Sequence, residues 1–435
     1  MNNDSDHLHR RGKACVLATG CPENRIDAAR IQEFLRGEGW EMIDDYRHAD
    51  LIVLNACGFT QDNETSSLEN IREIRAGMQP SAELLVGGCL SVIDPEKLRA
   101  AQHEAAFESD RIESLAQIVH ASTDPASVQA NYLLARTDEL APKRRKLPCL
   151  ANLLKPRAVA RRLTEPYRRK LSRAINVFDP KTFCIKISTG CLNACSFCAI
   201  RLARGRIRSR AIDEILCELK KGRAEGFTRF ALLGTDLGAY GRDHGATLAA
   251  LLERMTNEKG DFEIRLRNIQ PRFLIEMMAE LRPVFRSGKV TYLSSAAESG
   301  SNRILNLMRR GYTIEDYKQA IGILNREFPH IRIRTQLMVG FPGETEAEFR
   351  DTYRLLDELR FDFAEVYRFQ PRPNTAAAEM PDIVSPAVAC RRFYKLLLKA
   401  TFNQSARKQS ALRAYKAWMR DDAAGRSPSV ARTSS

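Results

Sequence analysis

The chain has 435 residues, 44% hydrophobic and 28% charged, a composition typical of globular proteins with room for two or three domains. No apolar run approaches the about 20 residues that a membrane-spanning helix needs, and residues 1–11 lack the apolar core of a signal peptide. Eleven cysteines without a secretion signal indicate a reducing compartment, so we expect a cytoplasmic protein whose cysteines bind metal and form no disulfide framework.

The net charge of +14 is concentrated in two segments. Residues 143–173 carry twelve Lys or Arg side chains and one acid, and residues 391–420 carry nine and no acid. The rest of the chain is therefore net acidic. Basic runs are often only solvated surface; the alternative is that both segments bind an anionic macromolecule, which includes an acidic partner protein.

Residues 14–124 alternate short apolar runs with segments of helical periodicity. The apolar runs predict strands at residues 14–18, 51–55 and 83–86, and the periodic segments predict helices at residues 26–35, 64–74 and 112–120. This alternation is typical of a parallel sheet with helices on both faces. Ligands of such sheets bind outside the carboxyl ends of the strands.

Cys21, Cys57 and Cys89, the N-terminal triplet, each follow one of these strands by two or three residues. We therefore expect their thiols to meet at one edge of the sheet and to hold a metal cluster. A free cysteine is usually a small buried hydrophobic side chain, but three at equivalent positions favour ligation. Three further cysteines lie inside strand or helix patterns and are expected in the core: Cys15, Cys184 and Cys217.

Residues 125–180 form a long connection, rich in Pro and Arg, whose structure the pattern does not define. Beyond it the alternation resumes, with strands expected at residues 183–188, 229–233, 262–266, 289–293, 331–337 and 363–369. The helices between them are expected at residues 212–222, 247–255, 271–285, 314–326 and 345–360. Six repeats predict a partial (βα)6 barrel over residues 181–371, with its chemistry in the loops that follow the strands. Residues 372–425 form a basic extension that is helical over residues 386–420.

The first of these barrel loops contains Cys191, Cys195 and Cys198, the barrel triplet, in a C-x3-C-x2-C pattern. Three thiolates at this spacing can hold three irons of a 4Fe–4S cluster and leave the fourth iron open. An open iron can bind S-adenosylmethionine (SAM) and deliver the electron that cleaves it into a 5′-deoxyadenosyl radical. The alternative is a structural zinc site, but zinc usually takes four ligands and no fourth Cys or His lies nearby.

Further motifs accompany the two triplets. They are TGCPENRID at 19–27, ADLIVLNACGF at 49–59, TGCLNAC at 189–195, ARG at 203–205, TDLGAYGRD at 235–243, MRRGY at 308–312 and GFPGET at 340–345. Over residues 14–124 and 183–382 the chain resembles the radical SAM methylthiotransferases. The first two motifs are most similar to the branch that modifies a ribosomal protein, and the next three to the archaeal and eukaryotic tRNA branch.

The resemblance implies an α/β protein with a flavodoxin-like N-terminal domain, a radical SAM barrel, two 4Fe–4S clusters and a reducing electron donor. The barrel triplet would hold the SAM-binding cluster, and the N-terminal triplet an auxiliary cluster that carries a sulfur atom. One SAM would methylate this sulfur and a second would supply the radical, so that a C–H bond of the substrate becomes C–SCH3.

The resemblance also suggests where SAM is held. Gly234 and Asp236 occupy the place where the family binds the methionyl ammonium, although a simple strand-end turn would explain them too. Arg208 and Arg210 could hold the SAM carboxylate, cap the helix that follows them, or lie in solvent.

Gly340 and Gly343 belong to a turn that approaches the adenine in the family, with a purely structural turn as the alternative. Glu298 stands where an amide is usual, and Gln336 stands where an Asp is usual. A histidine and a proline that normally precede the amide are missing from residues 294–297. These departures lie on the expected substrate side of the barrel.

Two substrates fit the resemblance. The small C-terminal β-barrel domain (TRAM) of the family is not visible in residues 386–420, which favours a side chain of a peptide or protein, for example a ribosomally made precursor peptide. The alternative is an adenosine near the tRNA anticodon, with the basic segments neutralising phosphates. A non-catalytic scaffold that binds RNA or a partner is a third possibility, which both intact cysteine triplets disfavour.

Overall fold

The computed structural model describes residues 11–102, 106–107, 112–122, 124, 128 and 181–403. The basic segment 143–173, all but one residue of the expected connection 125–180, and residues 404–420 of the second basic segment lie outside this part of the chain. No helix in these described ranges is long and apolar enough to cross a membrane.

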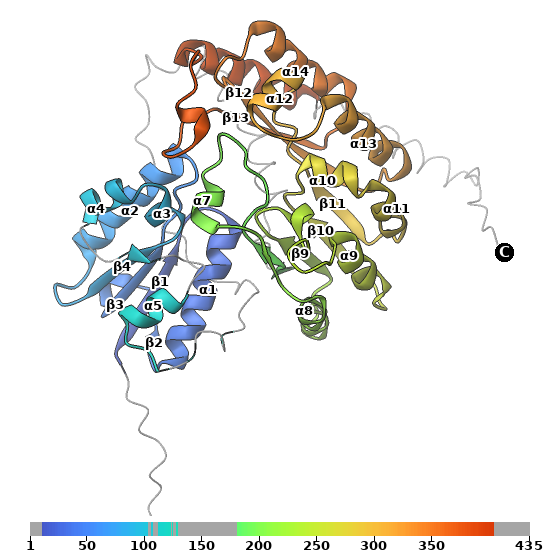
Figure 1. Cartoon of the computed structure of the whole chain (residues 1–435). Helices are drawn as coiled ribbons and strands as arrows, with labels where there is room; N and C mark the ends of the chain where they lie inside the picture. The colour runs from blue at the N-terminus through green and yellow to red at the C-terminus, as the bar shows by residue number, and fades with distance from the viewer. Residues whose placement is uncertain are drawn as a thin grey trace, which may run out of the picture.

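The N-terminal domain is a five-stranded parallel sheet with the order β2-β1-β3-β4-β5 (Figure 1). Its strands are β1 (Lys13–Ala18), β2 (Glu41–Met42), β3 (Leu51–Asn55), β4 (Glu83–Gly87) and β5 (Ala106–Phe107). Its helices are α1 (Pro22–Gly37), α2 (Gln61–Gly77), α3 (Cys89–Ile93), α4 (Pro95–Gln102) and α5 (Ile112–Ile118). Apolar side chains of α1 and α5 pack on one face of the sheet, and those of α2 and α4 pack on the other. The expected parallel sheet with helices on both faces is thus confirmed.

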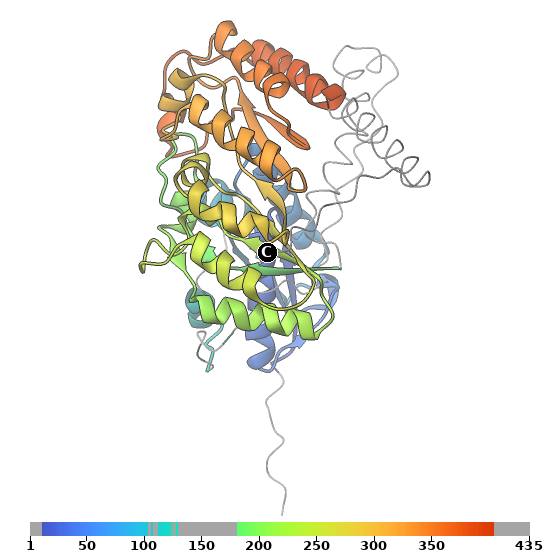
Figure 2. The same ribbon diagram turned by 90° about the vertical axis from the view of Figure 1, so that its right-hand side faces the viewer.

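The second domain is an open six-stranded sheet with the order β13-β12-β11-β10-β9-β6, all parallel. Its strands are β6 (Thr182–Lys186), β9 (Arg229–Leu233), β10 (Glu263–Leu266), β11 (Val290–Ser294), β12 (Arg332–Val339) and β13 (Phe363–Arg368). The helices after these strands are α7 (Ile200–Arg204), α8 (Ile212–Ala224), α9 (Leu248–Asn257), α10 (Pro271–Glu276), α11 (Met278–Arg286), α12 (Asn302–Leu307), α13 (Ile314–Glu327) and α14 (Glu346–Glu358). The partial barrel expected from the sequence is confirmed, and its helices stack along one side of the molecule in Figure 2.

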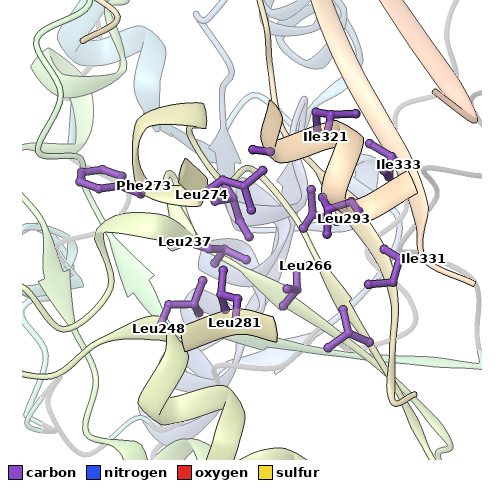
Figure 3. Close-up of a cluster of buried hydrophobic side chains, with 14 of the residues drawn as sticks. Leu237, Leu248, Leu266, Phe273, Leu274, Leu281, Leu293, Ile321, Ile331 and Ile333 are labelled. Atoms are coloured by element: carbon purple, nitrogen blue, oxygen red, sulfur yellow. The ribbon is translucent and has the colours of Figure 1, made fainter. Parts of the chain in front are cut away.

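The main core lies between the barrel strands and these helices. Figure 3 shows this cluster, in which leucine and isoleucine side chains of the strands meet those of the helices. Leu266, Leu293 and Ile333 are fully buried members from three neighbouring strands. Because apolar side chains of the strands face the helices, the alternate strand residues face the inside of the barrel.

Several details differ from the expectation. The helix expected at 271–285 is divided at Met277, whose backbone leaves helical geometry (φ −94°, ψ 8°). The sequence does not predict this break, because the apolar periodicity continues across it. The short antiparallel pair β7 (Ser188–Thr189) and β8 (Arg208–Ser209) was not expected. Cys217 was expected in the core but is exposed on α8. Cys15 and Cys184 are buried, as expected.

The C-terminal helix, described over residues 386–403, packs along α14. Its apolar residues Leu396, Leu397 and Ala400 belong to the main core. Its four cations all face the acids or aromatic rings of α14 and of the turn before it. The ion pairs are Arg391–Glu346 at 3.6 Å, Arg392–Glu344 at 2.8 Å and Lys399–Asp357 at 2.5 Å, and Lys395 lies over Phe349 and Tyr353. This part of the second basic segment therefore docks the helix on the barrel.

Candidate active site between the two domains

The N-terminal triplet lies at the carboxyl edge of the five-stranded sheet. β1, β3 and β4 are neighbours, and their last residues pair in register as Ala18 with Asn55 and Asn55 with Gly87. The three strands therefore end at one level. Each is followed within two or three residues by its cysteine, so the topology brings the triplet together as the sequence predicted.

Two glycines beside the triplet have no room for a side chain. Gly20 adopts φ +87°, and a Cβ there would lie 2.6 Å from Cys57 Sγ. Gly88, beside Cys89, adopts φ +100°, and a Cβ there would lie 2.4 Å from the Ala56 carbonyl oxygen. Both positions require glycine, because L side chains rarely adopt such φ values and no room for a Cβ exists.

The three thiols interact electrostatically with one another. Burial raises the pKa of Cys89 to about 11 and also raises the pKa of Cys57. Although Cys21 as a residue is exposed, the protein around its thiol and the neighbouring Glu23 raise its pKa to about 12. Thiols in such surroundings become thiolates when a metal replaces the proton. Asn63 Nδ2 already donates to Cys57 Sγ at 3.5 Å.

The barrel triplet lies in the loop between β7 and α7, and polar groups surround its sulfurs. The backbone N–H and the side-chain amide of Asn193 donate to Cys191 Sγ at 3.3 and 3.4 Å. Arg310 Nη1 donates to Cys195 Sγ at 3.4 Å, and its Nη2 donates to the Ala296 carbonyl at 2.9 Å. Hydrogen bonds to the ligating sulfurs are a common way for a protein to stabilise an iron–sulfur cluster.

Each triplet consists of thiols, the ligands that iron–sulfur clusters take. In the described ranges, no set of three His, Cys, Asp or Glu side chains lies close enough to hold one metal ion. A 4Fe–4S cube is wider than one ion and takes thiolate ligands, which matches two sets of three thiols with hydrogen-bond donors beside them.

The barrel loop is held in place from several directions. Ser196 donates its N–H to the Met308 carbonyl at 3.1 Å and its hydroxyl to the Leu307 carbonyl at 2.7 Å, both at the end of α12. The Phe197 ring meets Phe341 edge to face, with centroids 6.4 Å apart. The loop is thus a rigid part of the barrel, which suits a site that must position a cofactor.

Asp236 is buried directly after β9 and faces this loop. Its Oδ1 accepts from the backbone N–H groups of Gly238 at 3.0 Å and Gln270 at 3.1 Å, and its Oδ2 accepts from Asn193 Nδ2 at 2.7 Å. Burial raises its pKa to about 6 despite these hydrogen bonds. The carboxylate therefore orients the amide that donates to Cys191, a connection that its sequence position did not reveal. Gly234 lies between β9 and Asp236, and a Cβ there would come 2.7 Å from Ser188 Oγ.

The two arginines after the barrel triplet have different surroundings. Arg210 makes a two-pronged ion pair with Glu218 on α8 at 2.6 and 3.1 Å and donates to the Lys186 carbonyl at 2.9 Å. These bonds favour the helix-capping alternative for Arg210. Arg208 is exposed in β8, beside Gly205.

Glu298 is buried and interacts electrostatically with Arg310, the residue that donates to Cys195. Its backbone forms an isolated bridge with β12, and it adopts φ +62°, which is unusual for a residue other than glycine. Burial raises the pKa of its carboxyl, and the Arg310 guanidinium opposes this rise. Strained backbone with a buried acid is typical of functional sites.

The turn with Gly340 and Gly343 faces the C-terminal helix. Both glycines have positive φ, and a Cβ on Gly340 would lie 2.7 Å from Ala389 Cβ. Glu344 accepts from the Gly340 N–H and from Arg392, both at 2.8 Å. These contacts favour a structural role for the turn, which carries Phe341 to the barrel loop.

A buried charge network joins the elements that carry the two triplets. Asp27 on α1 accepts from Lys186 Nζ at 2.6 Å and from Arg204 Nη1 at 2.9 Å. Arg204 Nη2 also donates to Asn24 Oδ1 at 2.6 Å. Arg204, on α7, follows the barrel triplet, whereas Asn24 and Asp27 follow Cys21. Sequence reasoning found the motifs that contain these residues but assigned them no role.

Comparisons with known proteins agree with this arrangement. Residues 185–356 match the radical SAM superfamily, and residues 13–108 match the uncharacterized protein family UPF0004. The solved structure of the radical SAM methyltransferase TsrM from Kitasatospora setae aligns with a TM-score of 0.56 over 84% of this chain and 77% of its own, at 16% identity. The fold and the site together define a radical SAM enzyme with an additional N-terminal domain.

Relatives in the curated proteins specify the class further. A probable threonylcarbamoyladenosine tRNA methylthiotransferase of Pyrococcus horikoshii is 30% identical over 84% of this chain and 79% of its own. The ribosomal protein uS12 methylthiotransferase RimO of a Thermotoga species is 32% identical over 88% of this chain and 82% of its own. The chain therefore belongs to the radical SAM methylthiotransferase family, an enzyme family that uses two 4Fe–4S clusters and SAM.

Proposed function

We propose that this enzyme replaces a C–H bond of a macromolecular substrate by C–SCH3, with the SAM-binding cluster on the barrel triplet and the auxiliary cluster on the N-terminal triplet. When bound, the two clusters supply an electron for SAM cleavage and a sulfur atom for transfer. The observation that carries the proposal is the buried network of Asp27, Lys186 and Arg204, which joins the elements bearing the two triplets.

The residues around the barrel triplet have distinct roles in this proposal. Asn193 and Arg310 donate to the ligating sulfurs and stabilise their thiolate form. Asp236 fixes Asn193 and, with Gly234, offers a carboxylate to the methionyl ammonium of SAM. Glu298, which is buried, would line the side from which the substrate approaches.

Replacing Asp236 by asparagine is expected to raise the KM for SAM about tenfold or more, because a charge-assisted hydrogen bond to an ammonium contributes about 1.5–3 kcal/mol. The measurement is the rate of 5′-deoxyadenosine formation against SAM concentration in the anaerobically reconstituted enzyme. Asp243→Asn, which alters another acid of the same loop between β9 and α9, should leave the KM unchanged. An unchanged KM in Asp236→Asn would remove this residue from the SAM site.

We infer that the substrate is a side chain of a peptide or protein. The described cations of residues 391–403 are engaged by α14, which supports a role in docking the helix and not in neutralising phosphates. Inside the barrel, Arg334 binds Glu365 and donates to Ser294 Oγ at 3.1 Å, and Gln336 donates to the same Glu365 at 3.3 Å. Such a polar interior suits a charged or hydrogen-bonding target group. One relative, RimO, is named for a ribosomal protein.

A tRNA nucleoside is the second candidate, and the names of other relatives favour it. Several of them, including one from Archaeoglobus fulgidus at 29% identity over 85% of this chain, are named as threonylcarbamoyladenosine tRNA methylthiotransferases. The threonylcarbamoyl group carries a carboxylate, so the polar barrel interior would suit this substrate too.

The deciding experiment incubates the anaerobically reconstituted enzyme with SAM and dithionite. Separate samples receive total tRNA, ribosomal protein uS12, and peptides encoded by neighbouring genes. Mass spectrometry then looks for a gain of roughly 46 Da, the replacement of H by SCH3. A gain on a protein or peptide supports the proposed substrate, and a gain on an adenosine assigns the enzyme to tRNA. A gain in no sample, with 5′-deoxyadenosine still formed, leaves the radical step intact and contradicts all three substrates.

The double variant Arg391→Gln with Lys399→Gln is expected to change substrate affinity less than about threefold and to leave its salt dependence unchanged, because both cations already face acids. The measurement is fluorescence anisotropy of the labelled substrate against salt concentration. The matched control is Lys220→Gln with Arg254→Gln, two paired cations on the barrel helices. If this helix bound phosphates, the logarithmic salt slope would fall by about 2.

A further inference from the structure

Arg204 follows the barrel triplet in sequence and contacts residues beside the N-terminal triplet. It is 3% exposed, and its guanidinium lies among groups of the N-terminal domain although α7 belongs to the barrel. Its partners are Asp27, Asn24 and, at 3.9 Å, Glu23. In addition, its positive charge acts on all three thiols of the N-terminal triplet.

The proposal concerns this guanidinium and rests on the cluster assignment made above. We propose that Arg204 is a positioning residue that sets the charge balance of the auxiliary cluster site and makes reduction of that cluster easier. A residue next to the barrel triplet would thereby influence how easily the auxiliary cluster is reduced.

The charge balance explains why a cation is needed. Three cysteine thiolates carry more negative charge than the cluster core offsets, and one-electron reduction adds another negative charge. Glu23 and Asp27 lie within the same buried region, at 8% and 1% exposure, and make reduction harder still. Lys186 is taken up by Asp27 at 2.6 Å. Arg204 shares Asp27 with Lys186, and its charge acts on all three thiols, whereas the charge of Arg25 acts on Cys21. In a buried site such interactions are only weakly screened.

Arg204 also orients a neighbour of the triplet. Asn24 Oδ1 accepts from Arg204 Nη2 at 2.6 Å and from Cys89 Sγ at 3.8 Å. The Asn24 amide donates to the Thr19 carbonyl at 3.1 Å, and its own carbonyl accepts from Asn55 Nδ2 at 2.7 Å. Asn24 therefore keeps other hydrogen bonds when Arg204 is replaced. Loss of the guanidinium would then act on the cluster mainly through the loss of its charge.

The test measures the midpoint potential of the auxiliary cluster in the full-length chain. The three barrel cysteines are replaced by alanine, so that the auxiliary cluster is the sole cluster, and the potential is followed by electron paramagnetic resonance during an anaerobic redox titration. Two substitutions that each remove one charge are compared in this background: Arg204→Gln and Glu23→Gln. The first removes a positive charge beside the thiols, and the second removes a negative one.

We expect opposite shifts. Arg204→Gln should move the midpoint potential to a more negative value, Glu23→Gln should move it to a more positive value, and Arg204→Lys should restore most of the parent potential. Arg201→Gln, on the same helix, should change nothing. A merely structural role of Arg204 would not give shifts of opposite sign, because both substitutions would loosen the same interface.

Iron content separates the possible failures. If the parent with an intact N-terminal triplet binds no cluster, the ligand assignment itself is wrong. If the cluster forms and the two glutamine variants shift its potential in the same direction or not at all, the ligands stand and the role of Arg204 is overturned. If Arg204→Gln binds no iron, Arg204→Lys decides: a cluster with nearly the parent potential supports a role of the charge, and a cluster with a clearly shifted potential overturns it.

Discussion

Replacing Cys57 by alanine is expected to abolish the methylthiolated product while 5′-deoxyadenosine still forms from SAM. The reason is that Cys57 belongs to the N-terminal triplet, whereas SAM cleavage depends on the barrel triplet across the interface. The iron content should fall by about four atoms per chain, one 4Fe–4S cluster. Product and 5′-deoxyadenosine are both measured by mass spectrometry after a single anaerobic incubation.

Two matched variants frame this result. Cys15→Ala replaces a buried core cysteine in the same domain and should keep both products. Cys195→Ala removes a barrel ligand and should lose both. Normal methylthiolation by Cys57→Ala would show that the N-terminal triplet is not the auxiliary site.

Replacing Asp27 by asparagine is expected to lower the free energy of unfolding by about 3–5 kcal/mol, because two buried cations lose their shared acid. Lys186 and Arg204 are at most 4% exposed in their side chains, so water cannot take the place of the carboxylate. Urea denaturation of the full chain, followed by circular dichroism, measures the loss. Asp213→Asn, which alters an exposed pair with Arg254, should change stability by less than about 0.5 kcal/mol.

The same carboxylate predicts a pH dependence. Burial alone would raise the pKa of Asp27, but Lys186 and Arg204 together lower it below its ordinary value. A lowered pKa means that Asp27 contributes its stability fully above the unfolded value of about 3.9 and loses it as the pH falls through the folded pKa. The stability difference between the parent and Asp27→Asn should therefore shrink only below about pH 4. A difference that already disappears between pH 5 and 7 would contradict this assignment.

The positions of most strands and long helices were predictable from the sequence, because the patterns that indicate them involve neighbouring residues. β9, at Arg229–Leu233, has the predicted bounds, and the barrel strands differ from expectation by at most two residues at an end. Apolar runs and helical periodicity are properties of neighbouring residues, so the sequence displays them directly. The break at Met277 and the five-residue helices α3 and α7 were missed, because one turn of helix has too few residues to show a period.

The candidate site was predictable to the same extent. The six cysteines could be found because their spacing and their places after strands are written along the chain, and parallel pairing brings strand ends to one edge. The sequence could not decide whether Arg208 and Arg210 bind SAM or cap a helix, because only the fold shows Glu218 beside Arg210.

The amino-acid sequence by itself determined the alternation of strands and helices, the two cysteine triplets and the family. The tertiary structure alone decided which charges meet. Arg204 lies 177 residues from its partner Asp27, and Arg310 lies 115 residues from Cys195. Arg392 belongs to the basic segment 391–420, for which the sequence suggested an anionic partner, but it is buried against Glu344. Pairing over such separations depends on how the domains pack, and a buried charge is stabilised only by the partner that packing brings to it.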